Sequence, residues 1–527
     1  MRTNVLAVAA VVGLVVATPV LIAQRGAGAP APQPPASADA QKVRAVLDAA
    51  ADALGLLRGV QEQDSLSTLE IWGHGTQYAV GQAYKPDMPW PAFKVTMWHV
   101  SVGYDVPGMR VDVTRTNPDG VVQGGGGLPL AAPQRQIQVV NGKIAWNEQT
   151  PGMNGTPALA AATDRIMQLW ISPAGVVKAA RAAGATTKVT VQGGATVITF
   201  PVNGMPVTAT LNAKNLVEKV TWKSDNAVLG DVLNEVDYSD YKDLGGELYQ
   251  SDVLVPQRIM QKQGGFPVLD IMLDKANAYN PYVVFPVPDN VQKAYDSQPA
   301  TPAAPAVNTQ KLADGVYYLA GGTHFSVAVE FKDGIGLIEA PLNETRSLAV
   351  LAAAKAAIPN KPIKYLVNTH HHFDHSGGLR TIVANGIPIL TQAANKPYYE
   401  KVWMNPHTVV PDMLALAKTP KKPNVQAVID KQVLTDGNRT IELYKLAGSN
   451  HADTMMVAYL PKEKILVEAD VFTPGPMGQR PPVTAEATNL YDNIQRLKLD
   501  VNQIASTHGR MTDITELRLA AGRTATN

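Results

Sequence analysis

The segment His370-His371-His372-Phe373-Asp374-His375 places four imidazoles and one carboxylate within six residues. The apolar run Ile363–Val367 precedes it and predicts a short buried strand, and Leu379–Val383 follows it and predicts a helix. Side chains at such a junction are held by a rigid element on each side, as a metal site requires. Neutral imidazole binds zinc, iron and other borderline divalent cations, and a carboxylate adds negative charge. The segment therefore predicts a metal site at one edge of a sheet.

Three more candidate ligands follow in the chain, each beside a predicted strand. His451 lies before one apolar run, and Asp470 and His508 each lie after another. The three runs are Met455–Leu460, Ile465–Val467 and Val501–Ala505. Because the ends of neighbouring strands meet at one edge of a sheet, these side chains can converge on a common site.

The order His-x-His-x-Asp-His, then a lone His, an Asp and a final His, resembles the metallo-β-lactamase fold superfamily of metal-dependent hydrolases. The match has several parts over roughly 140 residues, so it is more specific than one short motif. The resemblance implies two metal sites that share a bridging carboxylate. The first would use His370, His372 and His451, the second Asp374, His375 and His508, and Asp470 would bridge them.

The resemblance implies an enzyme with a dinuclear zinc centre, with iron or manganese as alternative metals. Two cations close together would lower the pKa of a bridging water, and the resulting hydroxide would attack the substrate. Asp374 and Asp470 are the candidate catalytic residues, and the substrate would be a small molecule with an ester, lactone, thioester, lactam or phosphodiester bond. The chain has no cysteine, which excludes the branch of the family with a cysteine ligand. Ala469 stands where the family often has glycine.

Two other classes of function remain open at this point. The same fold also hosts iron-dependent dioxygenases and diiron oxidoreductases, which reuse much of this ligand set. No flavin-binding domain is evident after His508, which disfavours diiron electron transfer. The other alternative is a lipid-binding module in which the metal site is a relic.

The other histidines have different expectations. His371 alternates with the candidate ligands and is predicted to point away from the metals. His324 lies in a loop between two predicted strands and is a candidate residue of the substrate pocket. Isolated histidines without a partner at ligand spacing are expected to be ordinary surface or core residues; these are His74, His99 and His407.

The segment 395–421 is predicted to be an insertion on the substrate side of the metal domain. Its candidate substrate-binding residues are Tyr398 and Tyr399, and Trp403 and Met413 are further possible wall residues. The alternative is that these side chains only pack the insertion itself.

Length and composition predict about two or three domains in a chain of 527 residues. The predicted organisation is a signal peptide (1–27), a flexible leader (28–41), a β-rich accessory domain (42–290), a Pro/Ala linker (291–310) and the hydrolase domain (311–527). The net charge of +1, with no basic run among aromatics, gives no reason to expect nucleic-acid binding.

The N-terminus predicts the compartment. Arg2 is followed by the apolar stretch Val5–Ile22 and then by small residues, a pattern typical of a secretory signal peptide. A periplasmic or secreted protein is therefore expected. Membrane contact is expected only in the alternative case that this segment stays uncleaved as an anchor.

The region before the linker predicts a curved antiparallel sheet that carries helices. Val95–Val100 and Met109–Thr114 alternate as half-buried strands do, and Asn141-Gly142 predicts a hairpin turn. Helices are predicted over 38–57 and over 164–183, the second covering the concave face. Residues 65–285 resemble periplasmic lipoprotein-carrier half-barrels, which implies a possible hydrophobic ligand; the alternative is a domain that only positions the hydrolase. Gly124–Gly127 is predicted to be a flexible loop, without the Lys-Ser/Thr of a phosphate loop.

After the linker, short strands punctuated by glycine alternate with helices predicted over 348–357 and 486–499. This pattern predicts an αββα sandwich, so the expected fold class of the whole chain is α+β.

Overall fold

The computed structural model describes residues 37–61, 63–245, 252–299, 303–419 and 421–523. The predicted signal peptide and most of the predicted leader lie outside these residues. Within the described ranges, no helix has both the length and the apolar character needed to span a membrane.

The N-terminal region is built on one 13-stranded antiparallel sheet, the N-terminal sheet, in the order β8-β7-β6-β5-β4-β3-β15-β14-β13-β12-β11-β10-β9. Its strands are β3 (Thr68–Tyr78), β4 (Ala92–Gly103), β5 (Gly108–Thr116), β6 (Gln134–Asn141), β7 (Ile144–Glu148), β8 (Thr156–Pro157), β9 (Lys188–Gln192), β10 (Ala195–Val202), β11 (Met205–Leu211), β12 (Val217–Asn226), β13 (Gly230–Lys242), β14 (Val255–Gln263) and β15 (Phe266–Ala278). A small hairpin of β1 (Leu57–Arg58) and β2 (Gln63–Asp64) precedes them. The pairing of β3 with β15 joins the two halves of the sheet.

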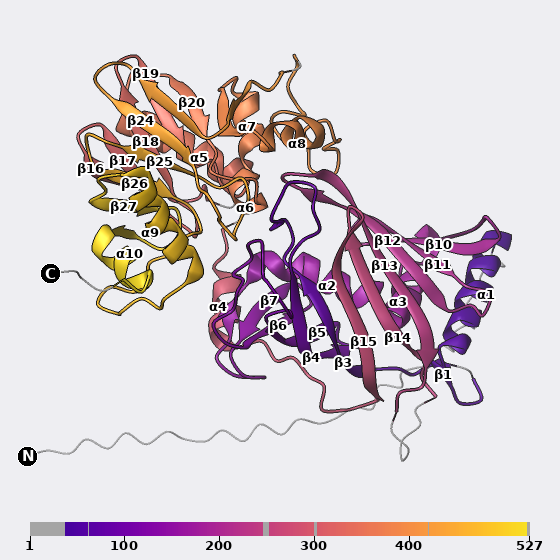
Figure 1. Cartoon of the computed structure of the whole chain (residues 1–527). Coiled ribbons are helices and arrows are strands. Elements are labelled where there is room, and N and C mark those ends of the chain that lie inside the picture. The colour runs from indigo at the N-terminus through magenta and orange to yellow at the C-terminus, as the bar shows by residue number, and fades with distance from the viewer. Residues whose placement is uncertain (1–36, 62, 246–251, 300–302, 420, 524–527) are drawn as a thin grey trace, which may run out of the picture.

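Helices cover the concave face of this curved sheet (Figure 1). Helices α2 (Ala162–Ile171) and α3 (Pro173–Ala182) lie on this face, with the short 3-10 turns η1 (Leu159–Ala161) and η2 (Gly184–Thr186), and α1 (Ala38–Ala53) packs on α3 and on the edge strand β9. Each of the three helices contributes side chains to one buried hydrophobic cluster with the sheet, for example Leu47, Leu169 and Val176. The predicted curved sheet with helices on its concave face is therefore confirmed.

The helix predicted over 164–183 is two helices. Ser172 adopts an extended conformation and accepts a hydrogen bond from the Gly175 N–H, which caps the start of α3. Pro173 occupies the first turn of α3, where its missing N–H costs nothing, but it could not continue α2. The helix predicted over 38–57 ends at Ala53, followed by Gly55 with φ +71°.

The predicted linker 291–310 begins inside a helix and ends inside a strand. Helix α4 (Asp289–Asp296) packs on β7 and β8, with Val291 fully buried. Strand β16 (Asn308–Ala313) opens the C-terminal region.

The C-terminal region contains two sheets and six helices within the described residues. The first sheet runs β16, β17 (Val316–Ala320), β18 (Ser326–Phe331), β19 (Gly334–Ile338), β20 (Ile363–Val367), β21 (Ile389–Gln392) and β22 (Val425–Val428). The second runs β23 (Lys431–Thr435), β24 (Thr440–Lys445), β25 (Met456–Leu460), β26 (Ile465–Glu468), β27 (Gln503–Ser506) and β28 (Met511–Asp513). The helices are α5 (Glu344–Ala357), α6 (Phe373–Ser376), α7 (Leu379–Ala384), α8 (Asn395–Val402), α9 (Ala485–Leu497) and α10 (Ile514–Ala520).

Three separate cores define the layers of this region. In β18, Val327 and Val329 face the second sheet, whereas Ala328 faces the core beneath α5, α7 and α8. In β25, Met456 faces the first sheet and Val457 faces the core beneath α9 and α10. This alternation, with a buried layer on each face of both sheets, confirms the predicted αββα sandwich.

Candidate metal centre

The first ligand group gathers His370, His372, His451 and Asp470, whose ligand atoms all lie within 4.8 Å of one another. The first two follow β20, and Asp470 follows β26. His451 precedes β25, which is antiparallel to β26, so it lies at the same edge of the second sheet. The group thus forms where the two sheets present their ends together.

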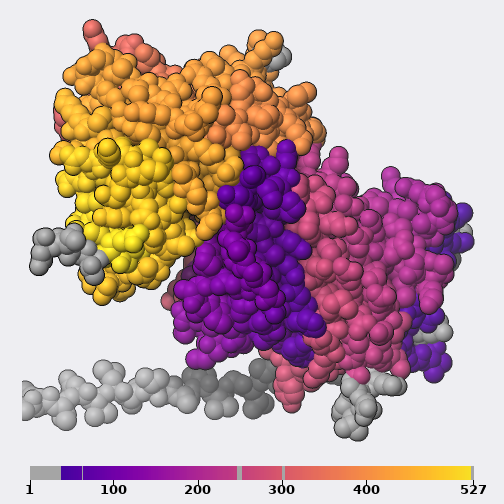
Figure 2. All heavy atoms as spheres, viewed as in Figure 1, coloured from indigo at the N-terminus to yellow at the C-terminus, as the bar shows by residue number. Residues whose placement is uncertain are grey.

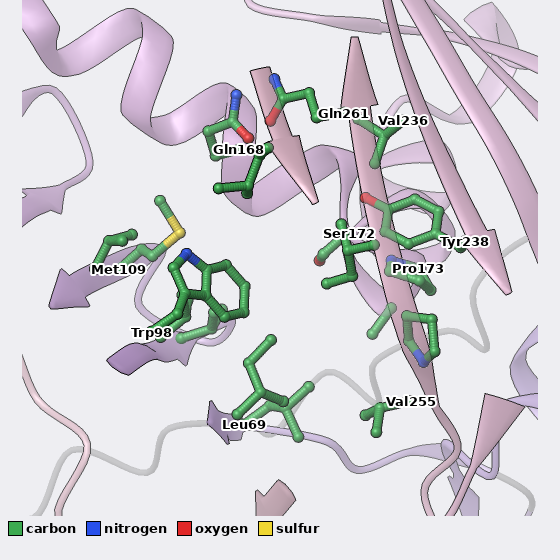
Figure 3. Close-up of a pocket in the computed structure, with 18 of the residues that line it drawn as sticks. Leu69, Trp98, Met109, Gln168, Ser172, Pro173, Val236, Tyr238, Val255 and Gln261 are labelled. Carbon is green, nitrogen blue, oxygen red and sulfur yellow. The ribbon is translucent and has the colours of Figure 1, made fainter. Parts of the chain in front are cut away.

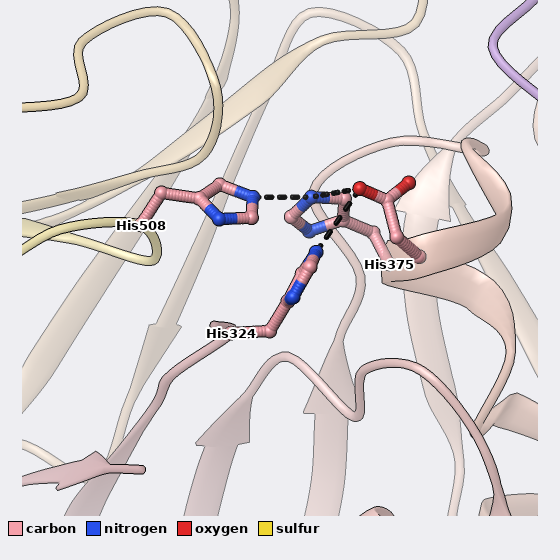
Figure 4. A group of neighbouring side chains, drawn as sticks. His324, His375 and His508 are labelled. Atoms are coloured by element: carbon pink, nitrogen blue, oxygen red, sulfur yellow. Dashed lines mark hydrogen bonds and ion pairs between the residues drawn. The ribbon is translucent and has the colours of Figure 1, made fainter. Parts of the chain in front are cut away.

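The second group gathers His324, Asp374, His375 and His508, again within 4.8 Å. Figure 4 shows His324 and His508 approaching His375 from separate segments. The Nε2 atoms of His375 and His508 are 3.1 Å apart, and Nε2 of His324 is 3.0 Å from Oδ2 of Asp374. His324 therefore belongs to this cluster as a possible fourth ligand, rather than lying alone on a pocket wall.

Asp470 lies between the two groups. Its Oδ2 is 3.1 Å from Nε2 of His370, 2.9 Å from Nε2 of His451 and 3.1 Å from Nε2 of His375. Its Oδ1 is 2.6 Å from Nε2 of His508. Asp470 adopts φ +64°, an uncommon conformation for a residue other than glycine, and such strain is typical of functional sites. One carboxylate thus faces both groups.

The donor atoms fit a metal ion. Nδ1 of His372 is buried and has no hydrogen-bond partner among the described residues, and the buried Nε2 atoms of His370 and His451 share one oxygen of Asp470 without a well-aligned hydrogen bond. A buried polar atom left unpaired is costly, and a bound cation would remove that cost. Around His375, three carboxylates come together: Glu339, Asp374 and Asp470. Buried negative charge of this kind is typically balanced by coordination of a metal.

In the first ligand group, protonation also favours ligation. Burial lowers the pKa of His370 to about 4, so the imidazole is neutral near pH 7. Burial alone would raise the pKa of Asp470, but His375 and His451 hold it well below its usual value. Neutral imidazole and ionised carboxylate are the forms that bind a divalent cation.

A second layer of groups orients the ligands. The buried Glu339 follows β19, with Oε2 2.7 Å from Nδ1 of His375, and its Oε1 accepts a hydrogen bond from the Thr369 N–H at 2.7 Å. Nδ1 of His508 is 2.9 Å from the Thr323 carbonyl oxygen. Such partners fix the ring orientation and the tautomer of a metal-binding histidine. Sequence reasoning missed Glu339, although an acidic residue directly after the apolar run Ile335–Ile338 was an available signal.

The N-terminal region enters the same site. Nε2 of Gln82 donates a hydrogen bond to Oδ1 of Asp374 at 2.8 Å, and Nε2 of His372 is 2.9 Å from the Ala83 carbonyl oxygen. Figure 2 shows indigo atoms of the N-terminal region packed against orange atoms of the C-terminal region. Residues from two separate sheets therefore set the surroundings of Asp374 and His372.

The glycine run 124–127, predicted to be a flexible loop, is held against the metal centre. The Gly124 N–H donates to the Asn450 carbonyl oxygen, and the Gly126 N–H donates to Oε1 of Gln82, both at 2.8 Å. A Cβ atom at Gly125 would lie 2.7 Å from Cε1 of His372. Only glycine permits this close approach without displacing the histidine.

A cavity of about 710 Å³, the metal-centre cavity, opens over the two ligand groups. The C-terminal region contributes Asp374, His451, Asp470 and His508, and the N-terminal region forms the opposite wall with Tyr78, Gln82, Phe93, Arg115 and residues 126–129. The Arg115 guanidinium stacks on Phe93 and donates to the side-chain oxygens of Gln77 and Gln134. No carboxylate among the described residues forms an ion pair with it, so its charge is available to an acceptor in the cavity.

The candidate substrate residues of the 395–421 insertion lie elsewhere. Tyr399 is fully buried, and its hydroxyl donates to Oδ1 of Asn368 at 2.7 Å. Tyr398 lines a different cavity, of about 240 Å³, together with His371. Neither tyrosine lines the metal-centre cavity, and Trp403 stacks on Tyr399 inside the core. The aromatic side chains pack the insertion because helix α8 turns this face toward the first sheet.

The insertion docks on the N-terminal sheet. Asp231, at the start of β13, accepts hydrogen bonds from the N–H groups of Thr408 at 2.8 Å and Val409 at 2.9 Å. The Asp231 N–H donates to the Pro406 carbonyl oxygen at 2.8 Å. The insertion is therefore a bridge between the two regions.

The remaining histidines lie outside both ligand groups. His371 points to Thr454, with Nδ1 2.8 Å from Oγ1. His74 contacts Asp274, and His99 stacks on Trp72 beside Glu70. His407 is buried near Asp225 and Asp412.

The C-terminal region is similar to known proteins in sequence and in fold. Residues 320–521 match the family model described as the metallo-beta-lactamase superfamily. Similar solved structures include a metallo-beta-lactamase from Pontibacter korlensis, with 21% identity and a TM-score of 0.31, covering 41% of this chain and 98% of that one. Others are metallo-beta-lactamase FIM-1 from Pseudomonas aeruginosa in its mono-zinc form (18%, TM-score 0.31, 41% and 93%) and rubredoxin oxygen:oxidoreductase from Desulfovibrio gigas (17%, TM-score 0.32, 41% and 60%). No curated protein sequence is found to match the chain.

Proposed function

We propose that the C-terminal region, a metallo-beta-lactamase-superfamily domain over residues 320–521, is a hydrolase that works with two divalent cations, preferably zinc. The observation that carries this proposal is the position of Asp470, whose carboxylate contacts both ligand groups: Oδ2 lies beside His451 of the first group and His375 of the second, and Oδ1 lies beside His508 of the second. Open, water-accessible sites that hold two cations through a shared carboxylate are suited to hydrolysis. Ester, lactone, thioester, lactam and phosphodiester bonds are the candidate substrates.

When bound, such cations supply Lewis acidity, which makes water more acidic and stabilises negative charge that develops on the substrate. The chain itself supplies orientation and proton transfer. Asp374, held by Gln82 on one oxygen and by His324 on the other, is placed to accept a proton from water. The same carboxyl group can then return that proton to the leaving atom. The Arg115 side chain on the facing wall would bind an acceptor oxygen of the substrate.

We also propose that the protein acts outside the inner membrane, in the periplasm or as a secreted protein. The support is the basic start and apolar stretch within residues 1–27. Sequencing the N-terminus of the mature protein would test export, because a start after about residue 27 indicates signal cleavage.

The test of the proposed function compares His372→Ala and Asp470→Asn with His74→Ala, an exposed histidine outside both groups. Metal content is measured by elemental analysis, and turnover is measured on a panel of ester, lactam and phosphodiester substrates. The expected result is about two zinc ions per wild-type chain, with turnover lost in both site variants and kept in the control. Full turnover in Asp470→Asn would overturn the proposal. Tightly bound iron with no hydrolysis would favour oxygen chemistry instead.

A further inference from the structure

A second cavity, the sheet cavity, lies on the concave face of the N-terminal sheet beneath α2 and α3. It has a volume of about 230 Å³ and is lined mainly by apolar side chains. Figure 3 shows Trp98, Met109, Val236 and Tyr238 around it. A cavity of about 150 Å³ is enough to bind benzene when its walls are apolar, so this one has room for an alkyl chain.

The polarity of the sheet cavity changes along the strands. Leu69 and Val255 line one end, whereas Gln168 and Gln261 line the other (Figure 3). On β3 the polar end is reached at Gln77, which is paired with Leu269 of β15 and Phe93 of β4. The residue after Gln77 is Tyr78, a wall residue of the metal-centre cavity. Along β3, the polar end of the sheet cavity is therefore the end nearer the metal-centre cavity.

One strand carries a face that lines both cavities. Met109, Val111 and Val113 of β5 line the sheet cavity, and Arg115 lines the metal-centre cavity. Because strand residues two apart share a face, these side chains form one continuous row. The Arg115 guanidinium also donates to Oε1 of Gln77, a wall residue of the sheet cavity, at 3.3 Å. The walls of the two cavities are thus in direct contact.

The charge of the residues that line the sheet cavity limits which class of ligand it can bind. No aspartate or glutamate of the described chain lines the sheet cavity, and its one charged wall residue is Arg165. The Arg165 guanidinium bonds only to neutral oxygens, those of Val139, Trp146 and Asn147. The site therefore suits an apolar chain with a head group that accepts hydrogen bonds.

We propose that the sheet cavity binds the alkyl chain of a medium-chain acyl ester and presents its carbonyl group to the metal centre past Arg115. The chain-binding half of this inference stands alone, and the presentation half rests on the proposed function. In the reaction, the oxygen of water bonds to the acyl carbon while the bond from that carbon to the alkoxy oxygen breaks. The alkoxy oxygen takes a proton, which releases an alcohol and a fatty acid.

The binding test uses the full chain, both metal-depleted and zinc-loaded, with 11-(dansylamino)undecanoic acid as the fluorescent probe. Hexanoic, octanoic and decanoic acids then compete for the probe. Saturable binding is expected in both metal states, with displacement about fourfold tighter for each added methylene. Val111→Trp fills the cavity and should weaken probe binding at least tenfold, while Val191→Trp, on the exposed face of β9, should not.

Thermal unfolding of each variant shows whether it is folded. If Val111→Trp does not fold, Ile71→Phe replaces it, because this substitution fills less of the same cavity. Absence of saturable binding, or equal binding by the wild type and a folded cavity variant, overturns the inference.

A second readout separates the inference from the proposed function. With p-nitrophenyl acetate, hexanoate and decanoate, kcat/KM should rise with chain length in the wild type and in Val191→Trp. The ratio of decanoate to acetate kcat/KM should fall at least tenfold in Val111→Trp. If no ester is hydrolysed but the probe binds, the proposed function fails for esters and chain binding stands. If esters are hydrolysed without dependence on chain length or probe binding, the hydrolase stands and this inference fails.

Discussion

Gln82 and Ala83 of the N-terminal region each form a hydrogen bond with a candidate metal ligand of the C-terminal region. The Gln82 amide holds Oδ1 of Asp374, which leaves Oδ2 directed toward His324 and His375. The Ala83 carbonyl accepts from Nε2 of His372, which leaves Nδ1 of that ring as the atom available to a metal. Single residues far from the ligands in sequence therefore decide which atoms can coordinate.

The contribution of Gln82 can be measured through metal affinity. We expect Gln82→Ala to weaken the more weakly bound cation about 10- to 100-fold, the usual effect of removing a hydrogen bond to a ligand. A chelator-competition titration with zinc gives both affinities. Gln292→Ala is the matched control and should leave both unchanged, because the Gln292 amide donates to Asp296 of the same helix, α4, and lies outside the metal centre. Identical affinities in Gln82→Ala and wild type would show that the hydrogen bond does not orient Asp374.

The sequence indicated the seven candidate ligands because most lie near the end of a predicted strand and because their order resembles that of the metallo-β-lactamase fold superfamily. It could not reveal Gln82, which is 292 residues away from Asp374 in the chain and lies in a loop without a motif. It also suggested Tyr399 as a pocket residue, since an aromatic residue in an insertion reads alike whether it faces solvent or core. The burial of Tyr399 depends on the packing of α8, a tertiary effect.

At the level of elements, the loop after α8 joins the C-terminal region to the start of β13 through Asp231. Hydrogen bonds from Thr408 and Val409 hold the pKa of Asp231 below its ordinary value of 3.8. An acid with a lowered pKa in the folded state stabilises that state above its unfolded pKa. This contribution is lost as the pH falls through the lower, folded-state pKa.

Thermal unfolding should therefore show a pH-dependent effect of Asp231→Ala. We expect a lower melting temperature than wild type at pH 7, with the difference shrinking as the pH falls below 3.8. Asp119→Ala, in an exposed loop after β5, is the control and should match wild type throughout. A difference that is constant from pH 7 to pH 3 would mean that the ionised form of Asp231 is not what stabilises the bridge.

Local patterns predicted individual elements well and their connections less well. The alternation of Met109 to Thr114 identified β5, and the Asn141-Gly142 turn identified the β6–β7 hairpin. The sequence contained a signal for the break between α2 and α3. Pro173 inside one continuous helix would remove a backbone hydrogen bond, so a helix end before it could have been predicted. The pairing of β3 with β15 joins residues about 200 apart, and no local pattern encodes such a contact.

On the scale of the whole molecule, the metal-centre cavity belongs to neither region alone. Its ligands come from the αββα sandwich and its facing wall from the N-terminal sheet. The sequence predicted two folded regions, but left open whether the first one touches the chemistry of the second. The resemblance of residues 65–285 to lipoprotein carriers remains a prediction.

Because both regions form the metal-centre cavity, metal binding by the C-terminal region should change amide exchange in the N-terminal region. Zinc loading should slow hydrogen exchange of the Gly124 and Gly126 amides, because Gly126 bonds to Gln82 and Gln82 holds Asp374. Hydrogen–deuterium exchange of the full chain, metal-depleted and zinc-loaded, measures this effect. The β9–β10 turn at Gly193 and Gly194 serves as the internal reference and should not change. Stoichiometric zinc binding with unaltered exchange at 124–126 would contradict it.

The hydrogen bond from His372 to the Ala83 carbonyl has a consequence for how this protein can evolve. Every amino acid carries that carbonyl, so selection cannot act on the identity of residue 83 through this bond. Selection can act only on the path of the loop. Gly125 is the opposite case, because any side chain there collides with His372. The two residues contact the same imidazole, yet the hydrogen bond constrains only the backbone path at position 83, whose buried side chain is limited by packing instead, while the contact at position 125 requires glycine itself.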